Sequence, residues 1–178
     1  PTYTATAWYH KRLNEELQRR VQEFETLINT APIGIGVATN PDCNEIWGNP
    51  EFTRMLRTGR EENLSKSARN QDLPFKILRD GQEVKPEDLP MQMACRESRD
   101  VLDQELEIVR SDGSSLYELA RASPLLDAAG NVRGCIAAFL DITDRKRAEQ
   151  ALLESEEQSR KRVVELETLR TVLQEKLQ

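Results

Sequence analysis

The sequence has little of what metal sites, catalytic triads and membrane spans are built from. Its 178 residues include one histidine and three cysteines, and no two cysteines form a CxxC pair. A zinc site is therefore not expected, and a Ser/His/Asp set has no histidine available in the middle of the chain. The longest apolar run, around Cys135 to Leu140, is far shorter than the roughly 18 residues that a membrane helix needs. We expect no catalytic residue, no metal and no membrane span in this stretch of chain, and we do not expect it to be an enzyme by itself.

Charge and composition narrow the possible partners. The net charge is −6 and no basic face stands out, so nucleic acid is not an expected partner. Charged residues make up 31% of the chain and hydrophobic residues 38%, which is typical of a small core diluted by long solvated helices. Cys43, Cys95 and Cys135 are widely spaced and fit reduced, buried thiols of a cytoplasmic protein. The chain opens with Pro1 and stops within a helical pattern at Gln178, so we expect it to be a piece of a longer protein.

Both ends of the chain carry the apolar spacing of helices. Residues 1–30 form the first predicted arm, which Ala31-Pro32 ends because proline lacks a donor and restricts the residue before it. Residues 144–178 form the second, with Thr143 or Asp144 as its cap. The apolar positions fit heptad seams, interrupted by polar residues such as Asn14, and predict a homodimer whose parallel or antiparallel sense stays open. The predicted pairing residues are Leu17, Val21, Phe24, Ile28, Leu152, Val163, Leu166, Leu173 and Leu177. For the first arm, packing on its own domain is the alternative.

The middle of the chain, residues 31–143, reads as a compact α+β domain. A short strand at 33–39 and a second at 45–47 flank a turn, and Asn49-Pro50 begins a short helix. Residues 57–74 lack periodicity and are predicted to be a loop with room for one helical turn. Helical spacing returns over residues 85–98, with Pro90 at the start of the helix. Strand patterns then follow, separated by the turns at 111–113 and 127–131, and consecutive hairpins of this kind predict an antiparallel meander. Gly34-Ile35-Gly36 lacks the third glycine and following helix of a dinucleotide site and instead indicates close packing in a strand.

Three segments of this middle region carry a family resemblance. They read PEDLPMQMACRES, EIVRSDGSSLYELARASPLLDAAGNVRG and FLDITDRKRAEQALLESEE, and from about Phe24 to about Glu157 the chain resembles a PAS domain. The resemblance implies a five-stranded antiparallel sheet in the order 2-1-5-4-3, with short helices on one face and long helices flanking the domain. It also implies a pocket for a cofactor or small molecule, and a sensory role ahead of a histidine kinase, cyclase or phosphodiesterase domain.

The pocket is where any ligand would bind, although plain core packing explains the same residues. The cofactor stays unknown. Haem lacks an axial histidine in the core, and the Asn-Cys-Arg-Phe motif of covalent flavin binding is missing, which argues against both. Few polar residues point inward in this pattern, so we expect a ligand that is small and apolar, or none. The predicted lining residues are Val37, Phe52, Met55, Leu56, Phe75, Met91, Met93, Leu106, Leu119, Ile136 and Phe139.

The last strand continues into the C-terminal helix without a turn, and Asp141, Ile142 and Thr143 form the predicted signal junction. By the resemblance, Asp141 bonds near this junction; a surface cap is the alternative. We therefore expect a cytoplasmic PAS sensory or relay module of a bacterial signal-transduction protein, of the sensor histidine kinase type, acting on an effector domain in the same chain. The alternatives are a structural dimerisation domain without ligand, and the PAS input of a diguanylate cyclase or phosphodiesterase.

Overall fold

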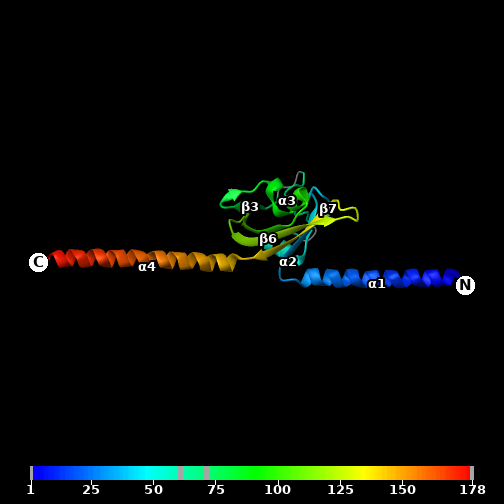
Figure 1. Ribbon diagram of the computed structural model, residues 1–178, viewed down its shortest axis with the longest axis horizontal. Helices are drawn as coiled ribbons and strands as arrows, with labels where there is room; N and C mark the ends of the chain where they lie inside the picture. Colours follow the sequence, from blue (N-terminus) through cyan, green and yellow to red (C-terminus); the bar gives the residue numbers. More distant parts are fainter. Residues whose placement is uncertain (1, 60–61, 70–72, 177–178) are drawn as a thin grey trace. The chain divides into compact units, whose positions relative to one another are not determined.

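The computed structural model describes residues 2–59, 62–69 and 73–176, and Figure 1 follows the chain through them. The chain divides into two compact units, Pro1–Asp141 and Ile142–Gln178. The first contains helix α1, Thr2–Thr30, and the α+β domain that follows it; the second is helix α4, Thr143–Lys176. Over the described residues, no helix combines the length and the apolar character that crossing a membrane requires.

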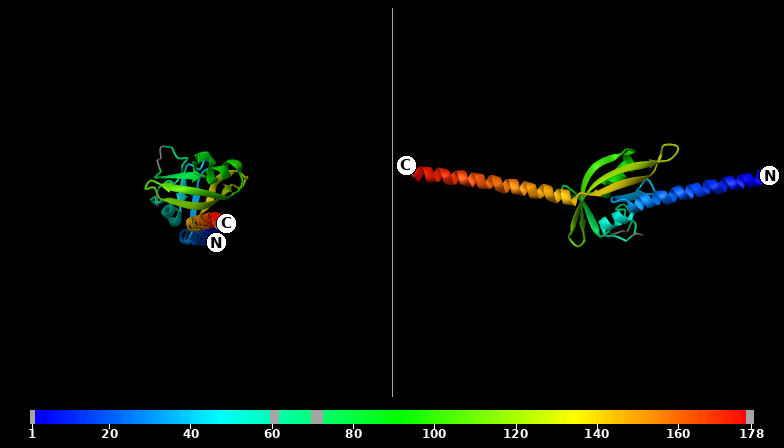
Figure 2. Two further views of the ribbon diagram at one scale, coloured as in Figure 1. Left: turned by 90° about the vertical axis from the view of Figure 1, so that its left-hand side faces the viewer. Right: turned by 90° about the horizontal axis from the view of Figure 1, so that it is seen from below.

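An antiparallel sheet forms the centre of the first unit and is seen from two further directions in Figure 2. Over the described residues it has seven strands, in the order β2-β1-β7-β6-β5-β3-β4. The first five in this order reproduce the 2-1-5-4-3 arrangement that the resemblance predicts, so the fold prediction is confirmed. The strands are β1 Gly34–Ala38, β2 Ile46–Gly48, β3 Phe75–Arg79, β4 Gln82–Glu83, β5 Val101–Arg110, β6 Ser115–Leu126 and β7 Val132–Asp141.

The expected count of five strands is too low because β3 and β4 add a small hairpin beside β5. Asp80 and Gly81 form its turn with φ of 52° and 77°. An Asp-Gly pair is a frequent solution for a two-residue hairpin, since both positions need positive φ. The Asp80-Gly81 pair was therefore a signal for this hairpin in the sequence. The strands themselves are too short to show a recognisable alternation.

Helix α2, Pro50–Leu56, begins where the sequence predicts. Asn49 caps it by accepting a hydrogen bond from the Phe52 amide at 2.9 Å, and Pro50 takes the first helical position. The Asn49 side chain also accepts from the Ile35 amide at 2.8 Å and donates to the carbonyl oxygens of Ile28 and Ile33, each at 2.9 Å. This one buried amide therefore joins the end of α1, the first strand and the start of α2.

Helix α3, Pro90–Glu97, begins at Pro90 as the sequence predicts, and a single 3₁₀ turn at Pro86–Asp88 precedes it. Its buried residues include Met91, Ala94 and Cys95, and the helix contacts β5, β6 and β7. Helix α2 contacts β1 and β2. The two short helices thus cover the sheet between them, and the main apolar core lies under them.

Candidate functional site

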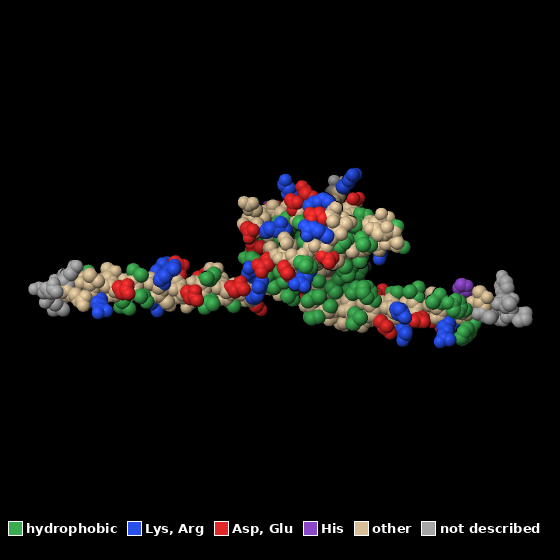
Figure 3. All heavy atoms as spheres, in the orientation of Figure 1, with side chains coloured by type: hydrophobic (Ala, Val, Ile, Leu, Met, Phe, Trp, Pro, Cys, Tyr) green, Lys and Arg blue, Asp and Glu red, His purple; other side chains and the backbone are tan. Residues whose placement is uncertain are grey.

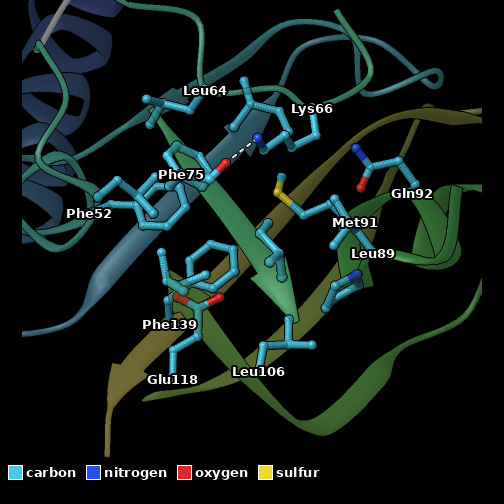
Figure 4. A pocket seen from close by; sticks show the side chains of 15 residues that line it. Phe52, Leu64, Lys66, Phe75, Leu89, Met91, Gln92, Leu106, Glu118 and Phe139 are labelled. Atoms are coloured by element: carbon cyan, nitrogen blue, oxygen red, sulfur yellow. Dashed lines mark hydrogen bonds between the residues drawn. The ribbon is translucent and has the colours of Figure 1, made fainter. Parts of the chain in front are cut away.

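A cavity lies in this core, between the sheet and the segments that cover it (Figure 4). About 40 Å³ is open to the centres of water-sized molecules. A cavity needs roughly 10–15 Å³ by this measure to hold one water, so the space accommodates a ligand of only a few heavy atoms. Six of the predicted residues line it, namely Phe52, Leu56, Phe75, Met91, Leu106 and Phe139.

Two stacked phenyl rings form one wall of the cavity. The rings of Phe52 and Phe139 lie 4.2 Å apart between centroids and are parallel to within 1°. Glycines beneath them make this possible: a Cβ on Gly36 would lie 3.2 Å from both rings, and one on Gly34 would lie 3.0 Å from the Met55 sulfur. The prediction that Gly34 and Gly36 serve close packing in a strand therefore has its physical reason in the aromatic pair.

Two polar side chains stand at the far side of the cavity from Glu118 (Figure 4). The Lys66 ammonium donates to the Phe75 carbonyl oxygen and lies 4.6 Å from the centroid of the Phe75 ring. Gln92 donates from Nε2 to the Ser67 hydroxyl at 3.0 Å. Lys66 and Gln92 also line a wider surface groove with Cys95 and Arg96, so they stand between the cavity and the outside.

Glu118 is the least expected lining residue. It lies on β6 with 2% of its surface exposed, and its Oε2 finds no hydrogen-bond partner among the described residues. Burial, and to a lesser degree the charge of Asp141, raises the pKa of Glu118 to about 8. The carboxyl group therefore holds its proton at neutral pH, because ionisation without a partner in an apolar setting is costly.

The predicted pocket needs correction at several positions. Val37, Leu119 and Ile136 are partly exposed and alternate with the buried residues of their strands, so they lie on the face of the sheet turned away from the cavity. Met55 is buried in the core and Met93 packs against it, but neither lines the cavity. Three of the fifteen described residues that line the cavity are polar, namely Glu118, Lys66 and Gln92, and the sequence prediction named none of them. The sequence prediction further missed the apolar lining residues Ile46, Leu64, Ile77, Leu89, Pro90 and Ile108.

The alternation in β6 is the signal that could have found Glu118. Leu116, Glu118, Ala120 and Ala122 are all buried, and the residues between them are more exposed. Ala120 pairs with Phe139, which the prediction already placed at the pocket. Because cross-strand partners share a face, this register turns Glu118 inward and Leu119 outward.

The three cysteines lie buried and free in the described structure. The sulfur atoms of Cys43 and Cys95 are 3.3 Å apart, and the Cys95 thiol donates to the Gly134 carbonyl oxygen at 3.4 Å. Burial raises the pKa of Cys43, helped by its hydrogen bond to Cys95, and burial raises the pKa of Cys135 to about 12. Cys43 and Cys135 are therefore protonated and slow to react at neutral pH. In the described part of the chain, no group of three or more potential ligands has a geometry that could hold a metal ion.

The junction residues fall at the boundary of strand and helix. Asp141 is the last residue of β7 and is exposed, Ile142 is buried, and α4 begins at Thr143. Asp141 pairs in register with Glu118 across β7 and β6. The cavity carboxyl group and the last residue of the strand are therefore direct cross-strand neighbours, with Cβ atoms expected at about 5 Å in such a pair.

Most predicted pairing residues of the two arms are exposed in the single chain. Figure 3 shows hydrophobic side chains in the open along both terminal helices. The exception is Ile28, which is 7% exposed and belongs to the core of its own unit. Leu177 lies outside the described residues. The pairing prediction stays untested at the others, which are Leu17, Val21, Phe24, Leu152, Val163, Leu166 and Leu173.

An antiparallel sheet of this strand order, closed over a small cavity by short helices, is the architecture of a PAS domain. The sequence profile of the PAS domain family matches residues 32–144, more than half of the chain, and the chain belongs to that family. A comparison with curated proteins finds no match.

Among solved structures, the chain is similar to an RNA-binding light-oxygen-voltage receptor at 23% identity and a TM-score of 0.56, covering 78% of this chain and 38% of the receptor. It is similar to a sensory box histidine kinase/response regulator from Burkholderia thailandensis E264 at 25% identity and a TM-score of 0.50, covering 78% of this chain and 98% of the other. It is also similar to the PAS domain of an HTR-like protein from Haloarcula marismortui at 20% identity and a TM-score of 0.50, covering 74% of this chain and 99% of the other. The first and third likenesses show the fold alone.

Proposed function

We propose that this chain is a sensory and relay module of a bacterial signal-transduction protein of the sensor histidine kinase type. It dimerises through its terminal helices and passes a conformational change from the PAS core to an effector domain along α4. The catalytic output belongs to that effector and not to this segment. The free, buried thiols favour a cytoplasmic setting, where disulfides do not form.

The observation that carries this proposal is the single residue between the last strand and the last helix. Strand β7 ends at Asp141 and α4 begins at Thr143. Strand β7 also pairs with both β1 and β6, so it is central in the sheet and borders the cavity through Phe139. A change in the cavity that moves β7 has almost no flexible backbone in which to dissipate before it reaches α4.

The exposed apolar residues of α4 support pairing with a second copy. The helix carries Leu152, Val163, Leu166 and Leu173 in the open, together with charged residues over most of its surface. A helix this polar is marginal in water without a partner. The 25% identical sensory box histidine kinase supports the kinase type of effector, and a diguanylate cyclase or phosphodiesterase is the alternative.

Sedimentation velocity tests the pairing. The wild-type chain should sediment as a dimer at about 50 µM, and the double variant Leu166→Glu and Leu173→Glu should dissociate at a concentration at least ~10-fold higher, because each change places a charge in the seam. Thr168→Glu with Thr171→Glu adds the same charge to the same helix outside the seam and should leave the dimer intact. A monomeric wild-type chain would refute dimerisation.

A fusion to a histidine kinase domain tests the relay. Asp141→Ala should leave the domain folded but shift autophosphorylation, because it alters the end of β7 next to α4. Asp100→Ala, an exposed carboxylate outside the strands, is the matched control. Kinase output that is the same in Asp141→Ala and wild type would remove the junction from the proposal.

A purely structural dimerisation domain is a second candidate, favoured by the small cavity volume of about 40 Å³. A core that binds nothing would still align two copies of an effector. A stable dimer whose spectra stay unchanged on addition of any small molecule would favour this function.

A further inference from the structure

The orphaned oxygen of Glu118 requires an explanation. Nearly every buried polar atom in a folded protein has a hydrogen-bond partner, and an unsatisfied one is a cost that a ligand can remove. Glu118 Oε2 is buried, has no partner among the residues described, and belongs to a side chain that lines the cavity. The Glu118 carboxyl group therefore has an unsatisfied polar atom at the edge of a cavity.

The charges near Glu118 indicate which kind of ligand group should bind its Oε2 atom. Asp141 on β7 is the cross-strand partner of Glu118, and the chain as a whole has a net charge of −6. A ligand carboxylate placed beside Glu118 would be repelled by Asp141, whereas a cation would be attracted by Asp141 and also by Glu118 once Glu118 has lost its proton. The ionised carboxylate is also an acceptor only, so its complement is a donor.

We propose that the cavity binds a short primary amine, whose ammonium group donates to Glu118 Oε2 and whose hydrocarbon part packs against Phe52 and Phe139. The inference rests on the sensory role proposed above and names the class of ligand for that role. A volume of about 40 Å³ restricts the ligand to a few heavy atoms, such as ethylammonium. The stacked rings of Phe52 and Phe139 offer an apolar surface for the hydrocarbon part of the ligand.

On the opposite side of the cavity, the ammonium group of Lys66 already lies against an aromatic ring. Lys66 places Nζ against the Phe75 ring and the Phe75 carbonyl oxygen. Lys66 and Gln92 border both the cavity and the outer groove, so they separate the two. Lys66 also repels a second cation at that end, which leaves the Glu118 end as the place for the ligand's ammonium group.

The proton balance gives the proposal a distinct signature. Without a ligand Glu118 is protonated at neutral pH, since its pKa is about 8. Binding an ammonium requires the carboxylate, so each binding event below that pH releases one proton to the solvent. The charged groups that face Glu118 in the described chain are Asp141 from β7 and Lys66 across the cavity. The other elements present uncharged groups: Leu106 from β5, Phe52 and Leu56 from α2, and Met91 and Gln92 from α3.

Nuclear magnetic resonance titration of the full 178-residue chain with ethylammonium, ethanol and acetate at constant ionic strength tests the inference. Ethylammonium should shift the signals of the cavity residues saturably, with a dissociation constant that is roughly millimolar at best for so few atoms. At about pH 8, ethanol should bind at least ~10-fold more weakly because it brings no charge, and acetate should not saturate. The affinity for ethylammonium should rise by nearly ~10-fold between about pH 6 and pH 7.

Variants and calorimetry decide the remaining outcomes. Glu118→Gln keeps the shape but not the charge and should lower ethylammonium affinity by at least ~10-fold at about pH 8, while the exposed control Glu105→Gln should not. If Glu118→Gln fails to fold, calorimetry of the wild type in two buffers of different ionisation enthalpy should still give about one proton released per amine near pH 6.

No saturation by ethylammonium, equal binding of ethanol, an unchanged Glu118→Gln affinity or no proton release would each overturn the inference. A stable dimer that binds no amine would reject the amine and leave the proposed function standing. A monomer that binds ethylammonium through Glu118 would support the amine site and reject the dimeric relay of the proposed function.

Discussion

The wild-type domain should lose stability as the pH rises from 4.5 to about 8. Replacing Glu118 by glutamine should remove most of this dependence on pH. The folded wild type holds the Glu118 proton up to a pKa of about 8, against an ordinary pKa of 4.5 for an exposed glutamate. Between these two pH values the folded chain binds more protons than the unfolded chain. The free energy of unfolding therefore falls as pH rises through this window, and it levels off on either side.

The magnitude follows from the width of the window. Each pH unit within it contributes at most about 1.4 kcal/mol, so the window from 4.5 to about 8 gives on the order of 5 kcal/mol as an upper bound. Water entering the cavity would reduce this loss. A loss of even half that size is a large part of the roughly 5–15 kcal/mol by which domains of this kind are stable. The amide of the Glu118→Gln variant has no proton to lose and no charge facing Asp141, so the variant should escape the loss.

Urea denaturation followed by circular dichroism, at closely spaced pH values from about 5 to 9, measures the effect through the change in midpoint at constant slope. Glu105→Gln should follow the wild-type curve because the Glu105 side chain is exposed on β5. Parallel curves for wild type and Glu118→Gln would show that Glu118 ionises at its usual pH. The account of the cavity as a site with a neutral carboxyl group would then fail.

Three further measurements test the packing of the domain. Phe139→Ala should cost about 3–5 kcal/mol in urea denaturation, because it removes the stack with Phe52 and leaves a larger hole, whereas the exposed Leu140→Ala should cost less than ~1 kcal/mol. Asn49→Ala should cost at least about 2 kcal/mol, since it removes a helix cap and leaves buried partners unsatisfied, while Asn44→Ala should be nearly neutral; equal effects would contradict the cap. Native protein should react with a thiol reagent at least ~100-fold more slowly than urea-unfolded protein, and fast labelling would refute the burial of Cys43, Cys95 and Cys135.

Local chemistry made parts of the fold predictable. Asn49-Pro50 begins α2 and Ala31-Pro32 ends α1 because the cap, the missing donor and the fixed proline φ act within a few residues. The meander of β5, β6 and β7 follows from turns that can be read in the same way. The order of the strands across the sheet is a long-range property, and it was available only through the resemblance to a family.

The small hairpin of β3 and β4 shows where periodicity runs out. Strand β4 has two residues, so alternation between faces cannot be recognised in it. The hairpin depends on pairing with β5, in which Phe75 lies opposite Arg110 and Ile77 opposite Ile108. Only the Asp80-Gly81 turn can be recognised from the local sequence. It predicts that the chain reverses but not which strand the reversed segment pairs with.

Glu118 was missed because its strand carries leucine on both faces. Leu116 points into the core and Leu119 away from it, so hydrophobicity alone permits either register of β6. The usual expectation that charged side chains lie in solvent favours the wrong register of β6, in which Leu119 points inward and Glu118 lies in solvent. The register is decided instead by Ala120 opposite Phe139, which leaves a carboxyl group where an apolar residue would cost less. A local rule is broken here at a considerable cost in stability, and such exceptions concentrate at sites where a sequence serves binding or signalling as well as folding.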